Sequence, residues 1–521
     1  MLSSPLVDLA ARAVTDADRT MLVEDDATLS FAQVHRHALA LGSFLRLMGV
    51  AKGDRVAVLM AKSHKQAIAQ LGVLAAGAVF VPVSDLLKWR QIEHILRDCG
   101  VKLAIVDHDK VDRLGAAAGG MRLITAGGEA ASTAAVLENI FKADLVERGP
   151  EIIGQDNAAI IYTSGSTGLP KGIVLSHRNL WDGARIVTSY LGLQADDRLA
   201  QVLSLNFDYG LNQLFGAIRV GASLHFTTFH FPKDLLTFLR VRRITTLALM
   251  PVFLNRLFDP RFFKPEFAEG IDSLQRITTS GGRVPLPIVK AIRQAFPTVD
   301  LYLMYGLTEA FRSTYLPPNQ VDIRPTSIGR AIPDAQILVL DEQGNECPPN
   351  APGELVHRGG VISKGYWNAL DKTAERFKTR MDESGNPEIV VYSGDIVKRD
   401  AEGYLYFIGR RDNMIKTAGH RVSPEEIERV AEQMEGIEHA VAFGKEHDVL
   451  GEEVVLVCIT QDGAAAPEPI EINAFLRERL AAYMVPHHIL FHAGFEVTPG
   501  NQGKVDRSSV KQLALGTLTS T

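Results

Sequence analysis

The chain has 521 residues, which predicts two or three domains, or one large domain with a small one. Its composition, 46% hydrophobic and 22% charged, is typical of a soluble globular protein. A formal net charge of −6 excludes bulk attraction to nucleic acid or to an anionic membrane. The longest apolar run, residues 71–83, is shorter than the roughly 20 residues of a membrane helix, so we expect no membrane insertion.

The cysteines argue against a secreted disulfide scaffold. Cys99, Cys347 and Cys458 lie far apart and form neither a zinc pattern nor a disulfide framework. We predict that all three are small core residues in a reducing cytosol. The first residues lack the basic start and apolar core of a signal peptide, so we expect a cytoplasmic protein.

In chain order, the predicted elements alternate between strand and helix. Apolar residues at helical spacing predict helices over residues 32–48, 66–76, 89–97 and 179–191. Short apolar runs predict strands over residues 56–59, 77–82, 103–107, 158–161, 244–249, 271–279 and 301–304. This alternation predicts an α/β fold with a largely parallel sheet and helices on both faces.

The last third of the chain has shorter elements. Residues 328–408 show alternating patterns that predict an antiparallel β-subdomain. Helices are predicted over 424–434 and 472–480, with strands over 440–444 and 454–460, which together indicate a small α/β unit. We expect Glu425, Glu426 and Glu428 to be solvated on one side of the first helix.

A glycine-rich and hydroxyl-rich stretch, Tyr162 to Gly172, follows the strand predicted at 158–161. Glycine permits backbone conformations that turn consecutive N–H groups toward one point. Hydroxyl residues add donors and Lys171 adds a positive charge, a combination that suits a polyphosphate. The donor residues are Thr163, Ser164, Gly165, Ser166, Thr167 and Gly168.

Two alternatives for this stretch are a P-loop and a flexible linker. A P-loop counted from Gly165 requires Gly-Lys-Ser/Thr, but Pro170 occupies the second glycine position and Gly172 the Ser/Thr position. A linker does not usually place Pro-Lys-Gly between a buried strand and an apolar segment such as residues 173–175. We therefore interpret the stretch as a phosphate loop of another kind.

The Tyr162–Gly172 stretch resembles the signature of the AMP-forming adenylating enzymes, which include acyl-CoA synthetases, adenylation domains of nonribosomal peptide synthesis and luciferases. The resemblance covers about residues 28–507. The run from Tyr305 to Tyr315 is most similar to freestanding exosortase-associated acyl-CoA ligases, and aminoacyl-carrier-protein ligases have a similar pattern. The family resemblance implies a large N-terminal domain, residues 1–411, of stacked sheets with helices and a β-subdomain. It also implies a small mobile C-terminal α+β lid, residues 412–521.

The second signature is Tyr305-Gly306-Leu307-Thr308-Glu309, directly after a predicted strand. By resemblance, Tyr305 lies against adenine, Thr308 holds phosphate and Glu309 binds Mg²⁺, a role that suits a hard carboxylate oxygen. The alternative is that Thr308-Glu309 is only a helix N-cap with an acidic first turn, for which an isolated Thr-Glu pair is typical. Gly281 and Gly282 also follow a strand, where ligands of parallel sheets gather.

The resemblance assigns further roles nearer the C-terminus. Asp395 and Arg410 correspond to the residues that contact ribose, and Asp412 to the hinge between the two domains. The loop of Gly419, His420 and Arg421 corresponds to the part that faces the thiol substrate after the hinge turns. Lys504 corresponds to the lysine that bridges the substrate carboxylate and the α-phosphate. Asp395 as a turn residue, Asp412 as a loop acid and Lys504 as an exposed turn lysine are the alternatives.

The clue to the substrate is Phe207-Asp208. Fatty acyl-CoA synthetases usually have a histidine at the position of Phe207, whereas amino-acid adenylation domains have Phe-Asp, whose aspartate pairs with the α-ammonium. A buried unpaired carboxylate costs several kcal/mol, so Asp208 facing the pocket would favour an amine-bearing acid. The alternative is that Asp208 caps the helix beginning near Tyr209. Candidate pocket residues are Phe207, Asn212, Gly281, Phe311 and Arg312, the last of which is also a candidate for binding a second carboxylate.

The resemblance implies a two-step ATP-dependent and Mg²⁺-dependent reaction: a carboxylate forms an acyl-adenylate with release of pyrophosphate, and a thiol then displaces AMP. No carrier-protein segment is recognisable, so we expect CoA or the phosphopantetheine of a separate carrier protein as the acceptor. A fatty or other non-amino acid remains the alternative substrate. A luciferase-type oxygenase and a nucleotide-binding regulator are the alternative classes, and the presence of Lys504 and Glu309 argues against the regulator.

Overall fold

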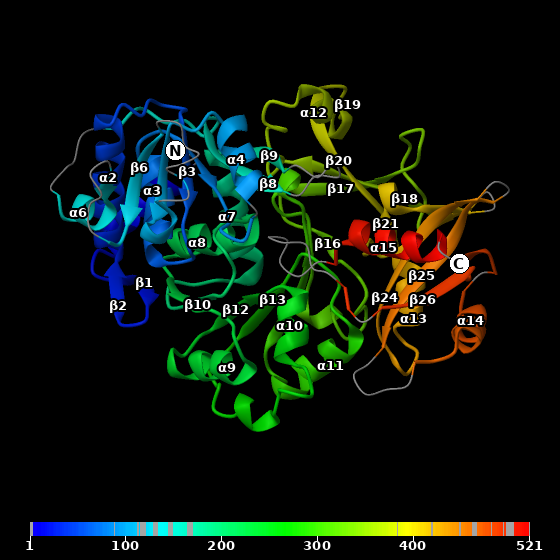
Figure 1. The fold of residues 1–521 in the computed structure, drawn as a ribbon. Coiled ribbons are helices and arrows are strands. Elements are labelled where there is room, and N and C mark those ends of the chain that lie inside the picture. Colours follow the sequence, from blue (N-terminus) through cyan, green and yellow to red (C-terminus); the bar gives the residue numbers. More distant parts are fainter. Residues whose placement is uncertain are drawn as a thin grey trace. The chain divides into compact units, whose positions relative to one another are not determined.

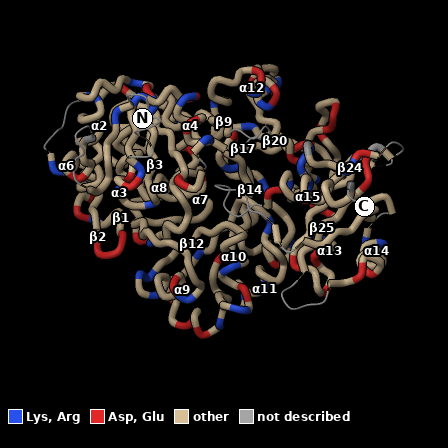
Figure 2. The backbone as a smooth tube through the Cα atoms, viewed as in Figure 1, with Lys and Arg blue, Asp and Glu red and all other residues tan. Residues whose placement is uncertain are grey.

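The structure is a computed structural model. It describes residues 4–87, 89–111, 114, 121–128, 134–143, 149–163, 170–382, 384–417, 420–447, 450–460, 466–480, 482–492, 494–495 and 505–519. The chain divides into two compact units, Met1–Ile337 with His357–Val391 and Leu338–Val356 with Tyr392–Thr521. No described helix is long and apolar enough to cross a membrane. Basic and acidic residues are interspersed along the chain, in keeping with its small net charge (Figure 2).

The first unit contains a seven-stranded sheet (Figure 1). In spatial order its strands are β7 (Ala134–Val136), β6 (Arg122–Ala126), β5 (Leu103–Asp107), β3 (Arg55–Leu59), β4 (Val79–Pro82), β8 (Asn157–Thr163) and β9 (Lys171–Ser176). All neighbouring pairs are parallel except β8 and β9. Val56 and Val58 pack into one core cluster while Ala57 and Leu59 pack into another, so the sheet is buried on both faces.

A nine-stranded sheet completes the first unit. Its spatial order is β16 (Arg330–Ala331), β15 (Thr314–Leu316), β14 (Asp300–Tyr305), β13 (Arg276–Thr279), β12 (Thr246–Leu249), β10 (Arg198–Gln201), β11 (Ser223–Phe226), β1 (Thr20–Glu24) and β2 (Ala27–Ser30). The pairs from β1 through β14 are parallel, whereas β2, β15 and β16 pair antiparallel. One core cluster contains residues from both large sheets.

Helices surround these sheets, as the alternating pattern predicts. They are α1 (Pro5–Thr15), α2 (Phe31–Leu47), α3 (His64–Ala75), α4 (Trp89–Asp98), α6 (Leu137–Lys142), α7 (His177–Leu191), α8 (Asp208–Val220), α9 (Pro232–Val241), α10 (Pro251–Leu257), α11 (Leu286–Ala295) and α12 (Leu370–Arg376). Strands β4 and β12 each begin two residues later than predicted, at Val79 and Thr246, and β13 begins at Arg276 rather than 271. Residues 272–273 form a turn, in which Ser273 donates to the Ile244 carbonyl at 3.0 Å.

The predicted β-subdomain is a five-stranded sheet in the order β17 (Ala335–Leu340), β18 (Pro352–Gly359), β20 (Pro387–Arg399) and β19 (Phe377–Met381), with β21 (Leu405–Arg410) also pairing with β20. The pairs of β20 with β19 and β21 are antiparallel. The division between the two units falls within β17, β18 and β20.

The second unit also holds a sheet of β23 (His420–Val422), β22 (Ile415–Thr417), β25 (Gly451–Thr460), β24 (Ile437–His447) and β26 (His488–Phe491). Its helices are α13 (Pro424–Ala431), α14 (Pro469–Arg477) and α15 (Arg507–Thr519). The α/β fold class, with large parallel-rich sheets, a β-subdomain and a smaller C-terminal part, is confirmed. So is the burial of the three cysteines, all of which are free thiols.

The prediction that Glu428 is solvated is wrong. Glu428 is buried on α13, and Arg507 at the start of α15 donates to both of its carboxylate oxygens, at 2.6 and 2.5 Å. Its Oε1 also accepts the backbone N–H of Ala442 at 2.7 Å. Burial raises the pKa of Glu428, and the guanidinium of Arg507 opposes that shift.

Candidate active site

The ends of the glycine-rich loop are held by the hairpin of β8 and β9. Thr163 pairs with Lys171 across the two strands, and both are half-buried. Gly172 is required for close packing, because a Cβ there would lie 2.7 Å from Ile160 and 2.9 Å from the ring of Tyr162. The loop residues predicted to bind phosphate lie outside the described residues: Ser164, Gly165, Ser166, Thr167 and Gly168.

Tyr366, which was not predicted as a site residue, lies close to two predicted ones, Lys171 and Glu309. Thr308 and Glu309 form a short 3₁₀ turn, residues 308–310, which the Ser363 N–H anchors by donating to the Glu309 carbonyl at 2.8 Å. The Tyr366 hydroxyl donates to Glu309 Oε1 at 2.6 Å. The Lys171 ammonium lies 5.9 Å from the centroid of the Tyr366 ring. Burial, together with the neighbouring Glu309 charge, raises the pKa of Tyr366, which keeps its hydroxyl protonated.

Glu309 is suited to Mg²⁺. Its Oε1 is occupied by Tyr366, and no described residue donates a hydrogen bond to its Oε2. Among the described residues there is no cluster of three or more His, Cys, Asp or Glu side chains that could hold a metal. A single protein carboxylate fits Mg²⁺, which keeps several waters and takes its other ligands from substrate phosphates.

Tyr305 ends β14 and lies parallel to a buried histidine. The Tyr305 and His357 ring centroids are 6.3 Å apart with 10° between the ring planes. Burial lowers the pKa of His357 to about 3, so its imidazole is neutral near pH 7. Neither ring nitrogen of His357 has a hydrogen-bond partner among the described residues. Tyr305 is therefore backed by an uncharged flat ring.

The glycine turn after β13 leaves an open surface. Gly281 has φ +92°, a conformation that favours glycine, and both Gly281 and Gly282 are exposed. A side chain at Gly281 would also approach Met250 Cε to 3.2 Å. The turn lies at the C-terminal end of a parallel strand, as predicted.

The predicted substrate residues lie at the start of α8. The helix begins at Asp208 with Phe207 at the N-cap position, so Asp208 is a half-buried residue of the first turn. Asn212 lies one turn later, buried, and its Nδ2 has no partner among the described residues. Gln66 and Gln70 on α3 donate to Asn206 Oδ1 at 2.8 Å and to the Leu205 carbonyl at 3.0 Å. These bonds fix the chain just before the helix.

The two predicted ribose-binding residues lie opposite each other in the second unit. Asp395 on β20 pairs in register with Arg410 on β21, and Arg410 Nε lies 2.8 Å from the Asp395 carboxylate. Asp395 is buried, and its N–H donates to Ser393 Oγ at 3.0 Å. Glu354 accepts from the Gly394 N–H on β20 at 2.9 Å and from Arg411, directly after β21, at 2.8 Å.

The hinge and lid residues are described only in part. Asp412 lies in a 3₁₀ turn, residues 411–413, and His420 and Arg421 lie on β23; the backbone alone is described for these three. Gly419 and Lys504 lie outside the described residues. The hinge at residue 412, a position within the second unit, and the role of Lys504 therefore stay predictions.

Sequence patterns missed the supporting roles of Tyr366, His357 and Glu354. Gly365-Tyr366 and Gly353-Glu354 do match positions of the adenylating family, but they carry no chemical signature of their own. His357 belongs to an alternating strand and shows no functional pattern. Their contacts with Glu309, Tyr305 and the β20–β21 pair became visible only in the fold.

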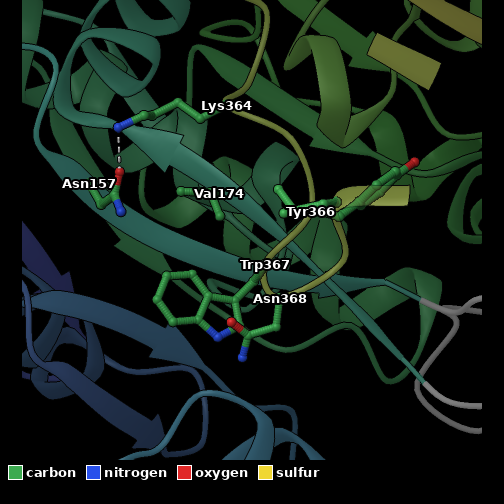
Figure 3. Close-up of a pocket in the computed structure, with 7 residues that line it drawn as sticks. Asn157, Val174, Lys364, Tyr366, Trp367 and Asn368 are labelled. Atoms are coloured by element: carbon green, nitrogen blue, oxygen red, sulfur yellow. Dashed lines mark hydrogen bonds between the residues drawn. The ribbon is translucent and has the colours of Figure 1, made fainter. Parts of the chain in front are cut away.

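An open pocket of about 490 Å³ adjoins this region (Figure 3). Its lining residues are Asn157, Val174, Lys364, Tyr366, Trp367, Asn368 and Leu370. Lys364 Nζ donates to Asn157 Oδ1 at 2.7 Å, and the Tyr366 ring extends away from Trp367 and Asn368 (Figure 3). Tyr366 thus belongs both to this pocket and to the candidate active site.

Parallel-rich sheets with a glycine turn and an acidic turn at strand ends are typical of nucleotide-binding α/β proteins. The AMP-binding enzyme family matches residues 9–367, and its C-terminal domain matches residues 426–499. The chain belongs to the AMP-binding enzyme family.

Two relatives and one solved structure are similar to most of this chain. Surfactin synthase subunit 2 of Bacillus subtilis is 30% identical over 493 residues, which cover 92% of this chain but 13% of that protein. The long-chain-fatty-acid–CoA ligase of Escherichia coli O6:H1 is 29% identical over 552 residues, covering 98% of this chain and 95% of the ligase. The crystal structure of ATP-bound MatB from Rhodopseudomonas palustris has a TM-score of 0.88 at 25% identity and covers 98% of this chain and 99% of MatB.

Proposed function

We propose that the chain is an acid–thiol ligase that forms AMP. In the first step a substrate carboxylate oxygen attacks the α-phosphorus of ATP, the bond to the pyrophosphate breaks, and an acyl-adenylate forms. In the second step a thiol attacks the acyl carbon, AMP leaves with that carboxylate oxygen, and the thiol proton is released. Membership of the AMP-binding enzyme family is the observation that carries the proposal.

The first step brings two anions together, so positioning and charge compensation are the main tasks. Lys171, Thr308 and the loop donors would bind the phosphates, and Tyr305 with Gly282 would hold the base. The Lys171–Tyr366–Glu309 cluster supports this assignment, because the Lys171 ammonium lies over the Tyr366 ring and the Glu309 carboxylate accepts from the hydroxyl of the same tyrosine. No protein nucleophile is needed.

Glu309 would hold Mg²⁺, which supplies charge compensation to the phosphate oxygens when bound. Asp395 and Arg410 would bind ribose, and Lys504 would bridge the carboxylate and the α-phosphate. A turn about Asp412 would then replace Lys504 with the Gly419–Arg421 loop for the thiol step. The paired position of Asp395 and Arg410 across two strands supports the ribose assignment.

The proposed substrate is an amino acid or another amine-bearing acid, with its ammonium on Asp208. The half-buried place of Asp208 in the first turn of α8, one turn from Asn212, supports an aspartate that faces a ligand. Phe207, Gly281 and Asn212 would line the acid. A fatty or other non-amino acid is the alternative, favoured by similarity to a long-chain-fatty-acid–CoA ligase over nearly its whole length.

ATP–pyrophosphate exchange over a panel of amino acids, fatty acids and aryl acids tests the proposal. We expect exchange with an amine-bearing acid, and Asp208→Asn should weaken it about 100-fold for that acid because an ammonium loses its counter-ion. Exchange only with non-amino acids would favour the alternative. CoA and a phosphopantetheinylated carrier protein, supplied separately, then identify the acceptor.

We also propose that the protein is cytoplasmic, which the three unpaired cysteines support.

A further inference from the structure

Arg312 is a buried cation whose neighbours leave part of it unsatisfied. Arg312 is only 3% exposed. Its Nε and Nη2 atoms have no hydrogen-bond partner among the described residues. Burying a guanidinium with open donors is strongly unfavourable unless a ligand completes them.

The backbone directly before Arg312 is strained. Phe311 has φ +50°, unusual for a residue other than glycine, and the Arg312 N–H donates to the Ala310 carbonyl at 2.6 Å. The Phe311 ring is fully buried and packs so closely on Gly183 that a Cβ there would lie 2.2 Å from it. Strain held by packing in this manner is typical of ligand sites.

The face of the guanidinium rests on a fixed aromatic ring. Arg312 Cζ lies 4.4 Å from the centroid of the Tyr209 ring, and the Tyr209 hydroxyl hydrogen-bonds Thr278 Oγ1 at 2.7 Å. Tyr209 follows Asp208 on α8, and Asn212 on the same helix carries a second buried, unpartnered donor, Nδ2, near Phe311 and Gly183. Open donors therefore gather beside the predicted substrate residues.

We propose that Arg312, with Tyr209 and Asn212 beside it, forms a subsite for a second carboxylate of the acid substrate. Nε–H and Nη2–H form one edge of the guanidinium, and their two parallel donors match the two oxygens of a carboxylate. The inference rests on the proposed function, because one carboxylate must be activated while the other lies on Arg312. The substrate class is then a dicarboxylic acid, which carries an amine as well if Asp208 binds an ammonium.

Matched acid and amide pairs test the subsite by ATP–pyrophosphate exchange. The pairs are aspartate with asparagine, glutamate with glutamine, succinate with succinamate, and glutarate with glutaramate. We expect kcat/KM for the preferred diacid to exceed that of its monoamide by about 100-fold, because the amide leaves the paired donors incompletely satisfied. A wild-type enzyme that handles both members of every pair equally overturns the inference.

Arg312→Gln should abolish the preference for the diacid, whereas exchange with the monoamide should persist. Arg312→Lys keeps the charge but lacks the two parallel N–H donors, so it should retain less than about one tenth of the preference for the diacid. Arg261→Gln removes an exposed arginine that pairs with Asp259 and should change nothing. If Arg312→Gln or Arg312→Lys slows acid and amide alike, or raises the KM for ATP with every acid, Arg312 is structural or serves the nucleotide, and the inference fails. Absence of exchange with every acid, monoacids included, would instead overturn the proposed function.

Discussion

At the scale of single residues, the candidate site depends on neighbours that hold each functional group in one orientation. Glu309 is held by Tyr366 and by the backbone N–H of Ser363, and Asp395 by Ser393 and Arg410. The contacts of Glu309 join residues far apart in the chain, so no local pattern indicates them. Glu309 and Tyr366, for example, are 57 residues apart.

Tyr366→Phe should weaken Mg²⁺ use because it removes the hydroxyl that orients the Glu309 carboxylate. Loss of one hydrogen bond to a charged group costs about 1.5–3 kcal/mol, so we expect kcat/KM about 10- to 100-fold lower and a higher Mg²⁺ requirement in the exchange assay. Tyr406→Phe removes a comparable bond to Asp400, at 3.1 Å in the second unit, and is the matched control. An unchanged Mg²⁺ requirement in Tyr366→Phe would contradict this role.

His357 should make the first unit sensitive to acid. Burial lowers its pKa to about 3, whereas a histidine in an unfolded chain titrates near 6.5. Its contribution to stability is complete above about pH 6.5 and is lost as the pH falls toward 3, because only the unfolded chain binds the proton there. Each pH unit costs about 1.4 kcal/mol.

His357→Phe keeps a flat ring and removes the titration. The drop in unfolding free energy between pH 7.5 and pH 5.5, measured by urea denaturation, should therefore be about 1.4 kcal/mol smaller than in the wild type. His230→Gln, at an exposed position, should leave the drop unchanged. An equal pH dependence in His357→Phe and wild type would show that His357 is not buried as a neutral group.

At the scale of elements, hydrophobic periodicity was sufficient for most helices and strands, because the sheets are buried on both faces and their strands are continuous apolar runs. It failed where a turn competes with the run, as at residues 272–273 before β13. The charge pattern of the 424–434 helix was misleading at Glu428, whose partner Arg507 is 79 residues away and reaches α13 only in the folded unit. Several predicted site residues, such as Lys171, Tyr305 and Arg410, lie at strand ends, whereas Asp395 lies inside β20 and was indicated by the family resemblance alone.

The start of α8 should be intolerant of any side chain at Gly210. A Cβ there would lie 1.9 Å from the Ser204 carbonyl oxygen, and a backbone atom cannot move aside as a side chain can. We expect Gly210→Ala to cost about 3 kcal/mol or more in urea unfolding and to lower exchange activity, because Phe207 and Asp208 shift with the backbone. Gly516→Ala on α15 meets no atom within 4 Å and should be neutral or stabilising by up to about 1 kcal/mol. Similar losses for both variants would argue against this packing.

At the scale of the whole molecule, the proposed mechanism requires different parts of the chain to serve the two half-reactions. The two compact units carry different groups of candidate residues, with Lys171 and Glu309 in the first and Asp395 and Arg410 in the second. Lys504→Ala should abolish ATP–pyrophosphate exchange by at least about 100-fold yet spare thioester formation from a synthetic acyl-adenylate. Equal loss of both half-reactions would rule out the proposed alternation.

The fate of a carboxylate oxygen atom shows whether the chain forms an acyl-adenylate. The acid substrate is labelled with ¹⁸O in its carboxylate and incubated with enzyme, ATP, Mg²⁺ and the thiol acceptor, and the products are analysed by mass spectrometry. Attack of the carboxylate on the α-phosphorus predicts one ¹⁸O atom in each AMP and none in pyrophosphate. Label in inorganic phosphate, with ADP as the nucleotide product, would contradict the account.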